Sequence, residues 1–182
     1  MALLEEPRGP IYAATFSAVA IAAAQDVFEI TAPSTGFVVL REIRLGNYSI
    51  AGDANAEMLS VLVLVGYTTT GSGGTTLTPA NVVNWTASGG SDVLGRTVSR
   101  APLVASSVVK ANNTTVAANG SPVTVLADTM NVAGGFRWYP GFRGERFVLD
   151  KSQRAVVRIT LPSISFTGNG TLLFQEIGTM LP

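Results

Sequence analysis

The sequence predicts an all-β protein, an antiparallel, jelly-roll-like β-sandwich folded as a single domain. Short runs rich in Val, Ile, Thr and aromatic residues alternate in polarity, as half-buried strands do. These runs recur every 8–12 residues or so between Gly, Pro and Asn turn signals, which gives about eight or nine strands and little helix. The chain has 182 residues and no cysteine, and this length is sufficient for one core without disulfides.

The first strands follow an N-terminal arm. Residues 1–10 include two prolines and lack periodicity, so we expect an extended arm that reaches onto a neighbouring molecule, followed by a β-sandwich domain over residues 11–182. Ile11–Ile21 is expected to be a strand, with a short helix as the competing interpretation. Asp26–Thr31 and Phe37–Leu45 alternate more clearly, and the Pro and Gly residues between them predict a hairpin.

The middle of the chain combines the most apolar run with the longest polar ones. Glu57–Tyr67 is expected to be a central strand that is covered on both faces, because it is rich in β-branched residues. Thr68–Thr76 is expected to be a Gly/Thr/Ser loop. Thr78, followed by Pro79, predicts the start of a helix of one or two turns. Residues 84–101 form an excursion of a length that is usually functional or interface-forming.

Several short strands are expected next, with Asn119-Gly120 as a turn. They are Leu103–Ala111, Asn113–Ala118, Pro122–Ala127, Phe136–Tyr139 and Arg146–Leu149.

At the C-terminal end we expect an antiparallel pair. Ala155–Leu161 and Thr171–Ile177 both alternate in polarity, and Phe147–Leu149 leads into the first of them. Asn169-Gly170 lies between the two strands and is a strong reversal signal, because both residue types tolerate positive φ.

The composition excludes several functions. The chain has no histidine and no cysteine, which removes Ser-His hydrolysis, thiolate metal sites and the commonest general base. Lys and Arg number 12, as do Asp and Glu, so neither nucleic acid nor membrane is expected as a partner. Only 13% of the residues are charged, about half the usual share, which favours a surface buried against other chains. The N-terminus resembles no signal peptide.

The densest group of candidate residues lies in Phe136–Phe147, where aromatic residues alternate with arginines. Such a segment can stack on bases or sugars while its guanidinium groups bind anions. We favour an intersubunit interface, in which the aromatic residues pack and the arginines pair with Glu145 or a neighbouring subunit. Arg143 and Arg146 are the best interface residues, since only Glu145 balances them. The candidate interface residues are Arg137, Trp138, Tyr139, Phe142, Arg143 and Arg146.

Other patterns carry little chemistry. Thr70–Gly74 lacks the Lys-Ser/Thr ending of a phosphate loop and is expected to be a flexible loop. The aspartates are scattered, without calcium-loop spacing, and Asp128 is expected to cap a turn. Glu42, Glu145 and Glu176 are the candidates for a carboxylate pair, but any pair drawn from a dozen acids is weak support for hydrolysis. We therefore expect no catalytic residue, metal or cofactor, and no enzymatic activity.

The C-terminal half carries a resemblance to a known group of proteins. Its motifs are Gly135–Gly141 (Gly-Phe-Arg-Trp-Tyr-Pro-Gly), Phe147–Gln153, Val156–Pro162 and Gly170–Gly178. In style and architecture, over about residues 10–178, the chain resembles small jelly-roll structural proteins of tailed bacteriophages, in particular capsid decoration (cement) proteins. The resemblance implies a non-enzymatic virion protein that is made in the host cytoplasm and bound on the capsid surface. It also implies a homo-oligomer, a trimer or another small oligomer, that clamps the major capsid protein.

Two alternatives stay open at this stage. A tail-fibre or head-fibre module that binds a host carbohydrate would use an exposed tryptophan, Trp85 or Trp138. A small all-β glycosidase would need two carboxylates about 5–9.5 Å apart across a cleft.

Overall fold

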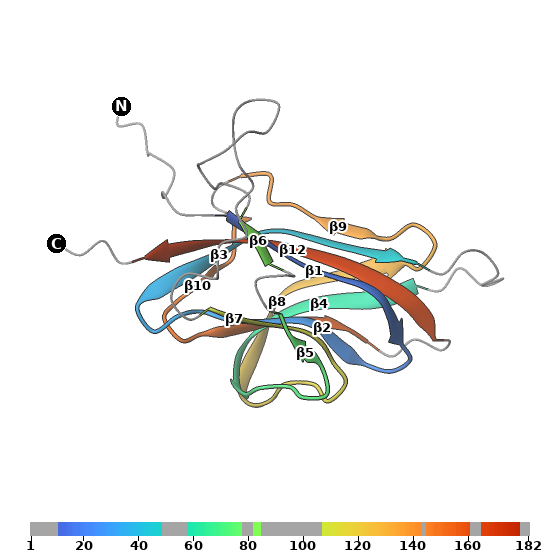
Figure 1. Ribbon diagram of the computed structural model, residues 1–182, viewed down its shortest axis with the longest axis horizontal. Helices are drawn as coiled ribbons and strands as arrows, with labels where there is room; N and C mark the ends of the chain where they lie inside the picture. The colour runs from blue at the N-terminus through green and yellow to red at the C-terminus, as the bar shows by residue number, and fades with distance from the viewer. Residues whose placement is uncertain are drawn as a thin grey trace.

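The computed structural model describes residues 11–48, 58–77, 82–84, 107–142, 145–160 and 165–178. These residues form twelve strands and no α-helix. The strands make two antiparallel sheets, which lie one above the other in Figure 1. The expected all-β sandwich is confirmed.

Sheet A, the upper layer in Figure 1, has the strand order β10-β3-β12-β1-β6, and β9 pairs with β3 beside β10. Its strands are β1 (Ile11–Ile21), β3 (Gly36–Asn47), β6 (Val82–Asn84), β9 (Phe136–Trp138), β10 (Val148–Leu149) and β12 (Phe166–Gly178).

Sheet B, the lower layer, has the strand order β5-β7-β2-β11-β4-β8. Its strands are β2 (Gln25–Thr31), β4 (Met58–Thr69), β5 (Thr75–Thr76), β7 (Val108–Asn113), β8 (Ala118–Asn131) and β11 (Arg154–Ile159).

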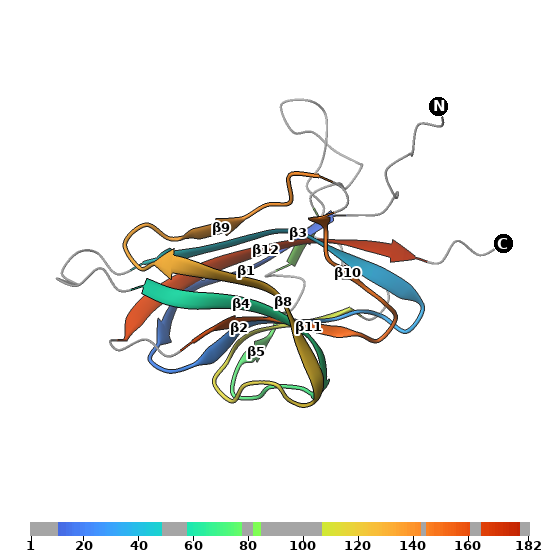
Figure 2. The same cartoon turned by 180° about the vertical axis from the view of Figure 1, so that it is seen from behind.

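The two orders together define a jelly roll. The chain alternates between the sheets through β1, β2, β3 and β4, and it does so again through β10, β11 and β12. On the return, β11 lies between β2 and β4. β12 lies between β1 and β3, as both views show (Figures 1 and 2), so the two halves of the chain interleave. This interleaving is the double Greek key of a jelly roll. The short strands β5, β6, β7 and β9 extend this frame at its edges.

Two expected pairings are wrong. The C-terminal strands β11 and β12 lie in different sheets, and so do β2 and β3, which were expected to form a hairpin. β11 instead pairs with β2 and β4, and β12 pairs with β3 and β1. Alternating polarity identifies a strand with one buried face, but either sheet of a sandwich offers such a face. The short connection from β2 to β3 therefore turns between the layers instead of reversing within one.

Asn169-Gly170 is not a reversal, because both residues lie inside β12, opposite Gly46 and Leu45 of β3. Gly170 is a packing residue. A Cβ at this position would overlap the ring of Phe16 and come within 2.9 Å of Phe28. The ring centroids of Phe16 and Phe28 are 5.2 Å apart, and this pair joins β1 of sheet A to β2 of sheet B. Glycine in the middle of a strand here gives a ring room to approach the backbone.

Asn119-Gly120 is likewise no turn before a strand. Both residues lie within β8 and have positive φ, 58° and 85°. β8 is irregular here, because its register with β4 shifts between Val65 and Tyr67, and Tyr67 pairs with Gly120. The positive φ angles that this dipeptide tolerates form a β-bulge, which bends the long edge strand β8.

The apolar run that was expected to form a central strand is β4, which lies inside sheet B between β11 and β8. Its inner face is buried through Leu59, Val61 and Val63. On the outer face, Leu64 is buried and the neighbouring Leu62 packs against it in a small second cluster. The expected cover on both faces is therefore only partial.

Other expected elements fall partly or wholly outside the described residues. These are the arm 1–10, the helix start at Thr78, the excursion after Asn84 and the first part of Leu103–Ala111. Val82–Asn84, which follows the expected helix start, is the strand β6. Of the expected strand Asn113–Ala118, Asn113 ends β7 and Ala118 begins β8, and residues 114–117 connect the two strands.

Candidate interaction surface

The segment with alternating aromatic and arginine residues lies along the outer edge of sheet A. β9 pairs with β3 at Phe136↔Leu45 and Trp138↔Ile43, and β10 pairs with the same strand at Val148↔Val39. The residues between β9 and β10 leave the edge of β3 and return to it. One strand of the jelly roll thus holds both ends of the segment.

Two aromatic side chains anchor this segment. Phe136 is buried in the core, and Trp138 stacks on Phe147 with ring centroids 4.9 Å apart and an interplanar angle of 10°. Both rings of the stack also pack against the core. The expectation that these three aromatic residues pack is confirmed, and one face of the Trp138 ring is already covered.

Because successive side chains of a strand point to opposite faces, Arg137 points away from the core, to the outer face of sheet A. There its Nε donates to Oε1 of Glu42 at 2.5 Å. Arg44, from the same strand as Glu42, donates to both carboxylate oxygens from Nε at 2.7 Å and Nη2 at 2.9 Å. Arg137 was expected to pair with Glu145 or a neighbouring subunit. Within the chain it pairs instead with Glu42, which lies two residues along β3 from Arg44, the cross-strand partner of Arg137.

Glu42 is a buried carboxylate between two exposed cations. The carboxylate side chain is 5% exposed, whereas Arg44 and Arg137 are 48% and 64% exposed. The hydrogen bond from Arg44 lowers the pKa of Glu42, and burial, which acts in the opposite direction, is outweighed. Glu42 therefore stays ionised and holds both guanidinium groups in place.

Glu145 has a different role from the one expected. Its Oε2 accepts hydrogen bonds from the backbone N–H groups of Gly141 at 2.9 Å and Phe142 at 3.3 Å. The carboxylate therefore closes the turn that carries Phe142. Arg146 is half-buried, and Arg143 lies outside the described residues.

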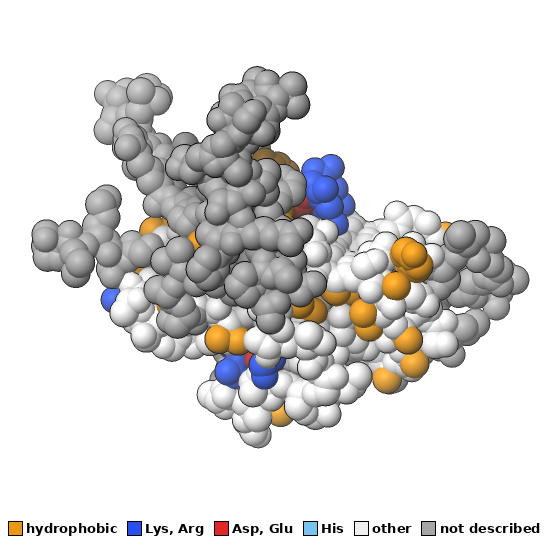
Figure 3. Space-filling view, in the orientation of Figure 1, with side chains coloured by type: hydrophobic (Ala, Val, Ile, Leu, Met, Phe, Trp, Pro, Cys, Tyr) orange, Lys and Arg blue, Asp and Glu red, His pale blue; other side chains and the backbone are white. Residues whose placement is uncertain are grey.

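Large apolar side chains are exposed beside these arginines. Tyr139 is 63% exposed, Phe142 75% and Val148 57%. In the space-filling view, basic side chains stand out at the upper edge of the molecule, next to acidic and apolar atoms (Figure 3). We call the exposed residues of β9, of β10, of the described chain between them and of the facing strand β3 the β9–β10 surface. It consists of Arg44, Arg137, Tyr139, Phe142 and Val148.

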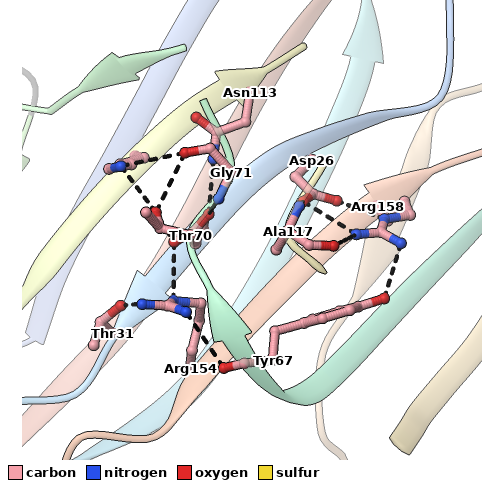
Figure 4. Close-up of polar contacts among 11 residues, drawn as sticks. Asp26, Thr31, Tyr67, Thr70, Gly71, Asn113, Ala117, Arg154 and Arg158 are labelled. Atoms are coloured by element: carbon pink, nitrogen blue, oxygen red, sulfur yellow. Dashed lines mark hydrogen bonds and ion pairs between the residues drawn. The ribbon is translucent and has the colours of Figure 1, made fainter. Parts of the chain in front are cut away.

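A second polar group, which was not expected from the sequence, lies on the outer face of sheet B (Figure 4). Arg158 of β11 donates to both carboxylate oxygens of Asp26, at 2.6 and 3.2 Å, across the pair β11–β2. It also donates to the Tyr67 hydroxyl at 2.9 Å and the Ala117 carbonyl at 3.0 Å. The Ala117 N–H in turn donates to Asp26 at 2.6 Å.

Glu29 is the centre of a parallel arrangement three residues along β2. Arg154 approaches its Oε1 at 3.0 Å, and the Thr70 hydroxyl donates to the same oxygen at 2.5 Å. The backbone N–H of Gly71 and the side-chain amide of Asn113 each donate to Oε2 at 2.8 Å. Together with the Asp26 group, these bonds fasten the turns after β4 and after β7 to the sheet.

The Thr70–Gly74 segment, expected to be flexible, is thus hydrogen-bonded to a buried carboxylate. Its glycines are required by close packing: a Cβ on Gly71 would lie 2.7 Å from both the side-chain nitrogen of Asn113 and the carbonyl of Thr115. The signal that could have identified this site is the placement of acids and arginines on the outer faces of β2 and β11. Only the register shows that they meet.

The chemistry of the second group is structural. Its carboxylates bind arginines and backbone donors, so the group stabilises turns. Of the three glutamates considered for hydrolysis, Glu42 binds arginines and Glu145 closes a turn. Glu176 is buried at 6% exposure and pairs with the core residue Val38. Asp128 lies within β8 and binds the N–H of Thr129, so the expectation that it caps a turn is wrong.

The described residues lack two further features. They contain no group of three acidic side chains placed to hold a metal ion. They also contain no helix long and apolar enough to cross a membrane.

Comparison with known proteins adds no relative. No protein family model matches the chain, and no curated protein or solved structure matches it.

Proposed function

We propose that this chain is a non-enzymatic virion structural protein, a bacteriophage capsid decoration protein. It forms a homo-oligomer, a trimer, on the outside of the head and stabilises the lattice of the major capsid protein. The observation that carries the proposal is the β9–β10 surface, in which exposed aromatic side chains lie beside ordered arginines. The jelly-roll strand order and the sequence resemblance support the same class of protein, although a fold alone does not specify a function.

The composition of the β9–β10 surface is that of a protein interface. Tyr, Phe and Arg are enriched at interfaces, and aromatic and Arg side chains provide much of their binding energy. Fully burying a side chain of this size contributes about 1.5–3 kcal/mol. Since each molecule on a shell repeats the same contacts, modest interfaces add up to firm attachment through multivalency. No chemical step is needed for such a role.

The carbohydrate-binding alternative has some support from the same residues, because Tyr139 and Phe142 are exposed rings that can stack on sugars. Of the two tryptophans considered for that role, Trp138 is already stacked on Phe147, and Trp85 lies outside the described residues. The ordered Arg44–Glu42–Arg137 group fits a charged protein partner better than a neutral sugar. We therefore favour the decoration role.

The test is cosedimentation of the purified chain with empty shells of the capsid protein from the same virus. The expected result is saturable binding at a fixed ratio to capsid subunits and a raised shell disruption temperature. A matched variant, Phe142→Ser, should weaken binding, whereas Val123→Ser on β8, 59% exposed in the native chain, should not. Binding of glycans but not of shells would contradict the proposal.

A further inference from the structure

The β9–β10 surface has unused binding capacity for an anion. Arg137 binds Glu42 through Nε alone, and Arg44 does so through Nε and Nη2. Within the described ranges, no residue binds the remaining N–H groups of these two guanidinium groups. Among the described residues, one carboxylate balances these two cations, which leaves one positive charge on an exposed surface. Guanidinium N–H groups that are already oriented favour a carboxylate partner.

The spacing of the surface indicates what shape such a partner has. Arg137 and Tyr139 are two residues apart, so in an extended chain they point to the same face about 7 Å from each other. β9 pairs with β3 on one side only, and no other described strand lies along its second edge. An extended segment lying along β9 would match this surface if it carried an acid and an apolar side chain two residues apart.

Three acids of the described residues have partners within their own fold. Asp26 and Glu29 bind arginines in sheet B, and Glu145 closes its own turn. In the whole sequence, only Glu5 and Glu6 stand next to each other, directly after Leu3-Leu4. Pro7 follows and favours an extended conformation of the residue before it.

We propose that Leu3–Glu6 of a second copy of this chain docks along β9 on the β9–β10 surface. In an extended segment, Leu4 and Glu6 share one face and Leu3 and Glu5 share the other, and either pair supplies the required spacing. When the segment runs antiparallel to β9, its glutamate lies over Arg137 and its leucine over Tyr139. The partner of the surface is thus an acidic, apolar strand supplied by the chain itself. This inference rests on the self-association in the proposed function and names its contact.

Disulfide trapping tests the contact, because the native chain has no cysteine. Single variants Leu3→Cys and Leu4→Cys are each mixed with Tyr139→Cys of a distinguishable mass and oxidised. The expected result is a mixed dimer that forms several-fold faster with one leucine variant than with the other, because neighbouring side chains alternate. Thr75→Cys, on the exposed strand β5 at the far edge of sheet B, replaces Tyr139→Cys in the control. It should form no mixed dimer with either leucine variant.

Two results would overturn the docking. One is trapping with Tyr139→Cys no faster than with Thr75→Cys. The other is a disulfide that forms within one chain of the doubly substituted variant Leu4→Cys/Tyr139→Cys, while no disulfide forms between chains when the single variants are mixed. As a second measurement, the double variant Glu5→Gln/Glu6→Gln should slow disulfide formation several-fold. This variant leaves Arg44 and Arg137 unchanged.

The failures of the two proposals are distinguishable. A stable oligomer that shows no trapping overturns the arm contact and leaves the proposed oligomer in place. A chain that is monomeric at all concentrations overturns both.

Discussion

Arg158 and Asp26 form the most buried ion pair among the described residues. The carboxylate side chain is fully buried and the guanidinium is 15% exposed. The guanidinium also stacks on Tyr67, 5.0 Å from the ring centroid. In spite of burial, which disfavours the charged form, the contacts with Asp26 raise the pKa of Arg158 further. Breaking such a pair costs much more than the pair contributes, because a charge is left behind in the interior.

Arg158→Gln is therefore expected to destabilise the protein by about 3–5 kcal/mol. Urea unfolding followed by tryptophan fluorescence measures this. The matched control is Arg137→Gln, whose guanidinium is 64% exposed and leaves Arg44 on Glu42, so about 1 kcal/mol or less is expected. Equal costs for the two variants would mean that the pair in sheet B contributes no more than a surface contact.

Glu176 makes the stability of the protein depend on pH, and the direction of this dependence follows from its burial. Its burial raises its pKa above the ordinary 4.5. The folded protein then holds the proton more tightly than the unfolded chain, so stability falls as pH rises from 4.5 through the raised value. Glu176→Gln removes this loss. We expect the variant to be more stable than the native chain at neutral pH and similar to it below pH 4.5, in urea titrations at several pH values.

Glu42 is the control, because its pKa is shifted in the opposite direction. Its pKa is lowered, chiefly by the hydrogen bond from Arg44, so its contribution is present above pH 4.5 and is lost as pH falls below that value. Glu42→Gln should be less stable than the native chain at neutral pH. If both glutamine variants shifted stability in the same direction, the assigned environments would be wrong.

At the scale of elements, β12 shows how one residue sets the position of a strand. Gly170 faces Phe16 and Phe28, which join the two sheets. Gly170→Ala is expected to cost about 1–3 kcal/mol, because overpacking forces rings off their preferred rotamers. Gly46→Ala, in the neighbouring strand β3, has no atom within 4 Å of its new methyl group and should change stability little. Thermal unfolding of both variants measures this difference in stability.

The turn after β4 depends on its hydrogen bonds to Glu29. Glu29→Gln would remove the ion pair with Arg154 and place an amide against donors such as the Gly71 N–H. A buried donor that loses its acceptor costs about 1–3 kcal/mol. We expect faster hydrogen exchange in residues 70–76 and unchanged exchange in β12. Exchange that rises equally in both places would indicate global destabilisation instead.

At the scale of the whole molecule, the exposed aromatic residues are expected to drive assembly. Tyr139→Ser and Phe142→Ser should leave the unfolding midpoint unchanged, since both side chains are largely exposed, and should lower the mass in solution. Light scattering on a sizing column, at matched concentrations, measures this. The control is again Val123→Ser, on β8. A stable trimer in all three variants would place the interface elsewhere.

The sequence by itself determined the class of fold and most of the strands. Polarity alternates every second residue in Asp26–Thr31 and Phe37–Leu45, and the structure has strands there, since a half-buried strand leaves this pattern locally. Composition likewise identified the Phe136–Phe147 segment as the place to look, because its residue types are typical of interfaces. The packing of Phe136, Trp138 and Phe147 followed from the same pattern.

The tertiary structure decided which strands pair and which charges meet. β11 and β12 look like neighbours in sequence, but each has an apolar face that either sheet could bury, so only the global packing assigns the sheet. The same holds for Asn169-Gly170, where a ring from β1 requires a glycine that sequence logic assigned to a turn. Arg137 meets Glu42 and Arg158 meets Asp26 because the register of distant strands places them together. Local polarity carries no information about the register that joins residues 95 and 132 positions apart, and that is why the sites had to be seen in three dimensions.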